Sequence, residues 1–460
     1  MNNLTSQLAT YVADARASSF PERALEIAKL GLMDSVATMF AGADQPAVAI
    51  MLEHLGARER SNNTAPVPFA GIGLSSQHAA IVNGVAAHVL DYDDVALSAH
   101  PSTVLMPAIL AEGHGLSSSG EDVLRAYVVG YEVWAQLAAR DSDPLHVKGW
   151  HPTGVFGAVA AAAAVAYLNG LPSSVGSHAF GLAASMSGGL VANFGSMAKA
   201  MHAGRAASCG IEAVHLAMLG FTASPDVFEH PAGFLKAFSP AGRVDVDSPV
   251  EIAPADPAIL RTGLSIKQYP ICYSSHRVVD AVLDIVSDLD LRGDDIEQVD
   301  VAIGLPQAAM LRNHAPVTGL EAKFSLEFAV AASIVSRAVG LDQLEDSFVA
   351  RHDVQALFPK VRIRVVDTVC PLDRAFALTD RVVIQRTRGG ACDSGEIRFP
   401  RGHAMNPISA AGLQKKFHQC LGRARGVSPV TDERFRHRLY DRLLALDMLA
   451  DIRTLYQLDA

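Results

Sequence analysis

The chain has 460 residues, half of them apolar, and its 48 acidic side chains outnumber its 38 basic ones, for a formal net charge of −10. This length and apolar content are enough for two or three folded domains and exclude a disordered chain. The acidic balance, with no basic run, argues against nucleic acid as a partner.

Two further features concern the compartment. The first residues, MNNLTSQLATYVADARASS, lack a basic start followed by an apolar core, so we expect no signal peptide. The five cysteines are scattered and odd in number, which disfavours a disulfide framework and indicates a reducing compartment, the cytoplasm. They are Cys209, Cys272, Cys370, Cys392 and Cys420.

The first half of the chain has a helical period. Residues 22–42, ERALEIAKLGLMDSVATMFAG, predict a helix that ends at Gly42. Ser119 lies three residues before Asp122, the spacing of a capping box, and predicts a helix start. Residues 155–168, VFGAVAAAAAVAYL, are too short to cross a bilayer with ease and predict a buried helix, so no membrane is expected as a partner. We therefore expect a large all-helical domain over residues 1–265.

The pattern changes near Ser265. Residues 299–303, 361–366 and 381–385 alternate with period two, and residues 395–399 are a fourth strand candidate. This predicts an α+β domain over residues 266–404, with a roughly four-stranded sheet and helices on one face. Residues 405–460 are helical again and are expected to complete the first domain. The predicted fold is mainly α with a second α+β domain.

The first candidate for chemistry is the stretch DYDD, with Asp91, Asp93 and Asp94. It lacks the spacing of a calcium-binding EF-hand, and no glycine-rich phosphate loop accompanies it, so we predict no metal. One interpretation is that these carboxylates cap a turn before a helix. The other is that one of them orients a histidine or a lysine and keeps it charged.

Two His-Pro pairs follow, at His100 and His151. Proline holds the residue before it in an extended conformation, which can direct a side chain into a cleft. Each pair is followed by a small hydroxyl residue and an alanine-rich helix. A single histidine is more often part of a core, but two such pairs together point to function.

Three cations come next in NFGSMAKAMHAGRAAS, with Lys199, His202 and Arg205 at three-residue spacing. One helical face could carry all three. The flanking residues, Met197 and Met201 among them, are small or apolar, so we expect the cations to point into an enclosed site. An enclosed cationic cluster in an acidic protein suggests an anionic ligand, in particular carboxylates.

The same segment allows a reading from a different class of enzyme. Ser196 and Lys199 match the SxxK motif of serine acyl-transfer enzymes. That motif needs companions such as KTG and SDN, and neither is present. The motif alone is weak support for an acyl-transfer enzyme.

The last candidates lie near the expected domain junction. QYPICYSSHRVVDA holds Cys272, Tyr273 and His276, which allow a Cys–His pair or an inert buried cysteine. EAKFSLEF places Lys323 near a helix start, as a substrate contact or a surface lysine.

Five segments in this order resemble the MmgE/PrpD family over nearly the whole chain. They are HAAIVNGVAAHVLDYDD with HPS, GWHPTGVFGAVAAAAA, GSMAKAMHAGRAA, QYPICYSSHRVVDA and EAKFSLEF. The resemblance implies a helical domain built from both chain ends, a smaller α+β domain and a homodimer. It also implies an active site at the domain junction that needs no metal or other cofactor. The site residues it implies are Asp91, His100, His151, Lys199 and the turn from Cys272 to His276.

The family includes 2-methylcitrate dehydratase, cis-aconitate decarboxylase and iminodisuccinate epimerase. Two positions depart from the decarboxylase branch: Val95 stands where that branch has threonine, and Cys272 where it has histidine. Both departures disfavour cis-aconitate decarboxylation.

The shared chemistry is proton transfer at a carbon beside a carboxylate. We predict catalytic roles for Asp91, His100, His151, Lys199 and Cys272. We predict substrate contacts from His202, Arg205, Tyr273, His276 and Lys323. A small polycarboxylate is the expected substrate. The predicted function is a hydro-lyase of the 2-methylcitrate dehydratase type, with epimerisation or decarboxylation as alternatives.

Overall fold

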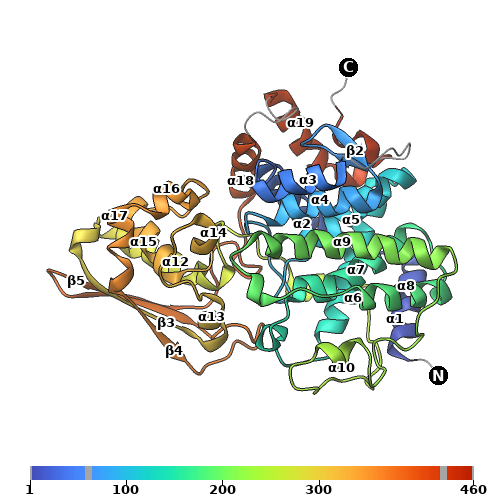
Figure 1. Ribbon diagram of the computed structural model, residues 1–460, viewed down its shortest axis with the longest axis horizontal. Helices are drawn as coiled ribbons and strands as arrows, with labels where there is room; N and C mark the ends of the chain where they lie inside the picture. Colours follow the sequence, from blue (N-terminus) through green and yellow to red (C-terminus); the bar gives the residue numbers. More distant parts are fainter. Residues whose placement is uncertain (1–2, 57–64, 425–431, 458–460) are drawn as a thin grey trace. The chain divides into compact units, whose positions relative to one another are not determined.

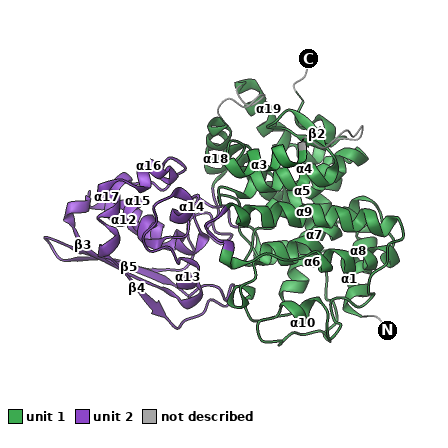
Figure 2. Ribbon diagram, viewed as in Figure 1, with its two compact units in different colours: residues 1–192, 197–264, 409–460 green, residues 193–196, 265–408 purple. Residues whose placement is uncertain are grey.

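The structure, a computed structural model, describes residues 3–56, 65–424 and 432–457. The chain forms two compact units (Figure 2). Unit 1 comprises residues 1–192, 197–264 and 409–460, and unit 2 comprises residues 193–196 and 265–408.

Unit 1 is built almost entirely of helices (Figure 1). They are α1 (Leu4–Asp14), α2 (Glu22–Ala41), α3 (Pro46–Gly56), α4 (Ser76–His88), α5 (Ser102–Leu116), α6 (Gly120–Ala138), α7 (Pro152–Leu168), α8 (Ser173–Ser185), α9 (Met197–Met218), α10 (Phe234–Phe238), α11 (Ala258–Thr262), α18 (Ala410–Arg423) and α19 (Glu433–Leu444). A two-stranded antiparallel ribbon, β1 (Ala65–Val67) and β2 (Ile72–Leu74), precedes α4.

Three of these helices form as their sequences predict. Gly42 follows the last residue of α2, and Ser119 caps α6 by accepting a hydrogen bond from the backbone N–H of Asp122. Every residue of α7 is buried, and α7 packs against α5, α6, α8 and α9. The alanine-rich segment is therefore the centre of a helical core.

The crossing of α4 and α9 brings distant polar residues together. A Cβ atom on Gly84 would lie 2.6 Å from the Cα atom of Gly204, and one on Gly204 would lie 2.3 Å from the carbonyl oxygen of Ile81. Only glycine permits such a close approach of the two backbones. As a result, His88 at the end of α4 comes within contact of Lys199 at the start of α9.

The C-terminal segment returns to unit 1, where α18 packs against α2. Lys416 of α18 is buried, and its Nζ atom lies 2.6 Å from Oδ1 of Asp34 in α2. The same ammonium donates to the carbonyl oxygen of Tyr92 at 2.8 Å. The chain end thus contacts the acidic loop that the sequence pointed to.

Unit 2 combines a sheet with short helices. The strands are β3 (Ile296–Gly304), β4 (Val361–Val366), β5 (Asp380–Arg386) and β6 (Ala391–Ile397). The helices are α12 (His276–Asp288), α13 (Leu305–Met310), α14 (Gly319–Ala322), α15 (Leu326–Ser336), α16 (Asp346–Val349) and α17 (His352–Gln355). Helix α12 packs against β5, β6 and α15.

The four-stranded sheet has the order β4-β3-β5-β6. Strands β3 and β4 are parallel, joined by a crossover that contains α13 to α17, and the other pairs are antiparallel. The fourth strand was predicted at residues 395–399 but runs from Ala391 to Ile397. Gly389 and Gly390 have positive φ and form a tight hairpin after β5, so β6 begins directly after the turn. The first residues of β6 are polar and do not alternate, so the sequence pattern did not indicate a strand there.

No single helix in the described part of the chain is long and apolar enough to cross a bilayer. Helices α2 and α3 taken together have the length and apolar composition of a membrane span, but the pair is bent. The second half of α2 is buried in unit 1.

Candidate active site

The loop between α4 and α5 carries the acidic run, and its backbone is unusual. Asp91, Leu97 and Ser98 all have φ between 52° and 55°, in the left-handed region. Aspartate visits this region with modest cost, but leucine does so only where the surrounding structure imposes it. The loop is therefore held in a defined conformation.

Asp91 forms a buried ion pair with Lys199 of α9. The Nζ atom of Lys199 donates to Oδ1 of Asp91 at 2.9 Å, and both side chains are less than a tenth exposed. The spacing between them is 108 residues. This pair confirms that an aspartate of the loop holds a cation, which was one of the two interpretations of the acidic run.

The capping interpretation concerned the start of α5. Pro101 is the N-cap residue of α5 and makes no side-chain cap hydrogen bond, while the Asp94 carboxylate interacts with the side chain of Ser102, the first residue of the helix. Asp91, Asp93 and Asp94 are all buried and contact other side chains instead.

Asp93 lies between two histidines. Its Oδ1 atom is 3.0 Å from Nδ1 of His88, and its Oδ2 atom is 2.7 Å from Nδ1 of His100. Burial alone would raise the pKa of Asp93, but His88 and His100 hold it well below its usual value. Asp93 is therefore a buried carboxylate in close contact with both rings.

His88 was not among the predicted site residues. Its Nε2 atom lies 3.1 Å from Nζ of Lys199. Burial, and next the charge of Lys199, lower the pKa of His88 to about 3, so the ring is neutral. The sequence signal for His88 was its position five residues before Asp93 in HVLDYD, which brings it back to the loop from the end of α4.

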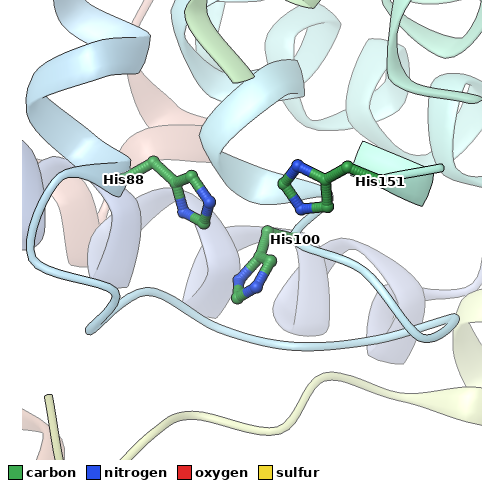
Figure 3. Close-up of side chains that lie close together, drawn as sticks. All are labelled: His88, His100 and His151. Carbon is green, nitrogen blue, oxygen red and sulfur yellow. The ribbon is translucent and has the colours of Figure 1, made fainter. Parts of the chain in front are cut away.

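His100 reaches the same cluster from the loop. Its backbone N–H donates to Oγ1 of Thr153 at 3.2 Å, and its Nε2 atom lies 3.7 Å from Oδ1 of Asp91. Figure 3 shows the rings of His88, His100 and His151 facing one another, each from a different segment. The centroids of the His88 and His100 rings are 4.4 Å apart.

His151 pairs with His202. His151 is extended, with φ −86° and ψ 109°, as the following Pro152 predicts, and it directly precedes α7. Its Nδ1 atom lies 3.0 Å from Nδ1 of His202. Burial, followed by Lys199 and nearby histidines, holds the pKa of His151 well below its usual value, and burial and Lys199 lower the pKa of His202 to about 4. Two neutral rings thus share one hydrogen bond.

The predicted cationic face of α9 is only partly correct. Lys199 and His202 are buried, but Arg205 is exposed. Each helical residue turns by about 100°, so Arg205 lies roughly 120° around the helix from Lys199. Met197 and Met201, taken as signs of an enclosed face, are 40% and 44% exposed.

The SxxK reading does not fit the contacts. Ser196 is exposed and donates its Oγ–H to the carbonyl oxygen of Asn193 at 2.7 Å. The ammonium of Lys199 is instead directed at Asp91 and His88. A serine acyl-transfer enzyme would need Lys199 against the serine hydroxyl.

The remaining candidates belong to unit 2. Cys272 is buried, and its backbone N–H donates to the carbonyl oxygen of Lys323 at 2.9 Å. His276 is buried and donates its Nε2–H to the carbonyl oxygen of Ile271 at 3.3 Å. The rings of Tyr273 and His276 are 4.9 Å apart. Unit 2 therefore groups these four predicted residues around one turn, and the wholly buried Lys267 precedes that turn in the chain.

The histidine cluster of unit 1 also has distances that could suit a metal ion. His88, His100 and His151 offer ligand atoms within 4.8 Å of one another, and so do His88, Asp91, Asp93 and His100. However, the ammonium of Lys199 already lies against His88 and Asp91. A divalent cation there would meet a like charge at close range, so the residues fit an ammonium better than a metal.

Comparison with known proteins agrees with this layout. The MmgE/PrpD N-terminal domain model matches residues 6–247, and the MmgE/PrpD C-terminal domain model matches residues 269–438. The cis-aconitate decarboxylase of Homo sapiens is 26% identical over 431 residues, which cover 91% of this chain and 87% of the relative. The cis-aconitate decarboxylase of Aspergillus terreus is 26% identical over 480 residues, covering 99% and 96%. A cis-aconitate decarboxylase-like protein, oryM, of Aspergillus oryzae is 26% identical over 482 residues, covering 99% and 97%.

The two family models match in order and together span most of both units. They agree with the mainly helical fold and its smaller α+β part. The chain therefore belongs to the MmgE/PrpD family of enzymes.

Proposed function

We propose that the chain is a hydro-lyase that acts on a small polycarboxylate of the 2-methylcitrate type, by proton abstraction beside a carboxylate and without a metal. The observation that carries the proposal is the buried ammonium of Lys199, held against Asp91 among neutral histidines. The reaction builds negative charge on a carboxylate beside the carbon that loses its proton. It needs a cation for that charge, a base and an acid.

The cation is Lys199. Its ammonium is buried, so it acts on a carboxylate more strongly than it would in water. Its partner Asp91 fixes its position. The N-terminal ends of α5 and α7, which follow His100 and His151, add partial positive charge on the same side.

The base is His100. Its Nδ1–H is directed at the carboxylate of Asp93, which leaves Nε2 to take the proton from the substrate carbon. Asp93 and Asp91 both lie close enough to stabilise the imidazolium that forms. This is the role that a buried aspartate has beside a catalytic histidine.

The acid is His151. A bound polyanion favours its protonated form, and the proton reaches it through the shared hydrogen bond with His202. The C–O bond of the substrate then breaks, and the hydroxide leaves as water with the proton of His151. The electron pair of the broken C–H bond becomes the new C=C bond. In unit 2, the family resemblance supports the turn from Cys272 to His276 as part of the site. We propose Cys272 as a further acid or base and Tyr273, His276 and Lys323 as substrate contacts.

Decarboxylation of cis-aconitate is the second candidate, because the relatives in both animals and fungi carry that name. In that reaction a C–C bond to a carboxylate breaks and a carbon takes up a proton. It needs the same cation and a proton donor, but no base for a C–H bond. The dehydration needs such a base, and His100 beside Asp93 supplies one.

The experiment is proton NMR in D₂O with 2-methylcitrate, citrate, cis-aconitate and single-enantiomer iminodisuccinate, each added separately. A new vinyl signal from 2-methylcitrate supports the dehydratase. Loss of carbon dioxide from cis-aconitate would instead identify the protein as a decarboxylase. Deuterium uptake and racemisation of iminodisuccinate, with its carbon skeleton unchanged, would identify the protein as an epimerase. We also propose a cytoplasmic homodimer, from cysteine usage and from the family resemblance; sedimentation at several concentrations tests the dimer.

A further inference from the structure

His88 is buried to 1% exposure as the last residue of α4, yet both of its ring nitrogens lie against charged groups. Nδ1 lies 3.0 Å from the carboxylate of Asp93, and Nε2 lies 3.1 Å from the ammonium of Lys199. A histidine that only filled the core would need one such partner. This ring instead connects the anion beside His100 with the cation of the site.

The proton positions on this ring follow from its partners. Asp93 is an ionised carboxylate and can only accept, so Nδ1 of His88 carries the proton. The ring is neutral, so Nε2 has a lone pair and accepts from Lys199. One tautomer of His88 is therefore fixed by Asp93.

Lys199 is then held by two acceptors on different segments. Oδ1 of Asp91 lies at 2.9 Å and Nε2 of His88 at 3.1 Å. Two hydrogen bonds from one ammonium fix the direction of its remaining N–H. Asp93 also lies 2.7 Å from Nδ1 of His100, so one carboxylate contacts both the ring that acts as base and the ring that holds the cation.

We propose that Asp93 and His88 form a positioning pair, in which Asp93 fixes the tautomer of His88 and His88 holds the ammonium of Lys199 in place for the substrate. The pair acts through Lys199 and has no need to touch the substrate. The proposal deepens the function proposed above, and its effect on turnover rests on that function. Its effect on Lys199 itself does not.

Two substitutions separate the two halves of the ring. In His88→Asn the amide can still donate to Asp93 but cannot reach Lys199. In His88→Gln the longer side chain can still accept from Lys199 where Nε2 did. The matched control is His54→Gln, at an exposed histidine of α3 in the same unit. Circular dichroism and thermal unfolding establish that each variant is folded.

The first measurement needs no substrate. Lysines are labelled with acetic anhydride over a range of pH, and the rate at Lys199 is followed by peptide mass spectrometry relative to the exposed Lys415. Only the uncharged amine reacts, and His88→Asn removes an acceptor that favours the charged form. We expect labelling of Lys199 to rise roughly tenfold in His88→Asn, because the loss of one hydrogen bond to the amine has an effect of that order. We expect a smaller rise in His88→Gln and none in His54→Gln.

The second measurement is the pH profile of kcat/KM with the substrate found by NMR. We expect His88→Asn to lose roughly 10²-fold in kcat/KM, because misplacement of a positioned group has effects of that size. Its alkaline limb should move to lower pH, and His88→Gln should recover part of the rate.

Unchanged labelling of Lys199 in folded His88→Asn would overturn the proposal, whatever happens to turnover, because a purely structural histidine predicts that result. If His88→Asn does not fold, His88→Gln and Asp93→Asn decide by the same labelling. In Asp93→Asn the carboxylate that fixes the tautomer of His88 becomes a neutral amide. His88 should then hold Lys199 less firmly, and labelling of Lys199 should rise as well. If no polycarboxylate reacts with the wild-type enzyme, the proposed function fails, but the labelling still tests the pair.

Discussion

The Nδ1 atoms of His151 and His202 lie 3.0 Å apart, and both rings are neutral, so one of them donates and the other accepts. The proton can sit on either ring, as the proposed transfer toward His151 requires. We predict that His202→Asn keeps KM and lowers kcat by about 10²-fold, because an amide can hold His151 but cannot pass a proton on. Steady-state kinetics on the NMR substrate measure both constants.

Arg205 provides the control for this prediction on the same helix. It is exposed and points away from Lys199, so Arg205→Ala should leave kcat and KM nearly unchanged. A loss in Arg205→Ala as large as that in His202→Asn would contradict the geometry of α9 described above.

The contact between the chain end and α2 predicts a large effect on stability. Lys416 is the buried cation beside Asp34, while burial and then Asp34 raise the pKa of Asp94 well above its usual value. Lys416→Met leaves a carboxylate buried without its cation, which costs about 3 kcal/mol or more of unfolding free energy. Urea unfolding measures it against Lys415→Met, a neighbouring exposed lysine whose loss should cost less than about 0.5 kcal/mol. Equal effects of the two substitutions would show that the ion pair is unimportant.

The buried histidines predict that the fold loses stability in acid. The pKa of His202 falls from 6.5 to about 4 and that of His88 to about 3 on folding. Between those values the unfolded chain binds more protons than the folded one, so stability falls as the pH drops below 6.5. Each such histidine contributes about 1.4 kcal/mol per pH unit in that interval. Across this pH interval, the free energy of unfolding should fall less steeply with decreasing pH in His202→Gln than in the wild type. An equal slope would refute the lowered pKa of His202.

Cys272 tests the contribution of unit 2. If the Cys272 thiol acts as a further acid or base, Cys272→Ala should lower kcat by roughly 10²-fold while the fold stays intact. Cys272→Ser, which keeps a proton on the same side-chain length, should retain more activity than the alanine variant. Wild-type kinetics in Cys272→Ala would remove it from the chemistry and leave it as a core residue.

The helices and the outline of the sheet could be predicted because their periods are local. Gly42, Ser119 and the buried segment at 155–168 carry their signals within a few residues. Strand β6 was misplaced because its polar residues, ACDS, show no alternation, and only pairing with β5 places it.

Individual candidate residues could be named from the sequence, but their arrangement could not. The pairing of Lys199 with Asp91 spans 108 residues and depends on the glycines that let α4 and α9 cross. His202 and Arg205 lie three residues apart on the same helix, so the sequence pattern alone did not show that His202 points inward and Arg205 outward. His88 gave only a weak signal, its position five residues before Asp93, because a histidine in an alanine-rich helix is usually an ordinary core residue.

The most direct test of the central claim is the rate at which the vinyl product of 2-methylcitrate forms in D₂O, followed by proton NMR in the wild type, Lys199→Met and Lys415→Met. We predict a product signal with the wild type and with Lys415→Met, and a rate at least about 10³-fold lower in folded Lys199→Met, because the cation for the developing charge is gone. A folded Lys199→Met that forms product at nearly the wild-type rate would contradict the assignment of this cluster as the active site.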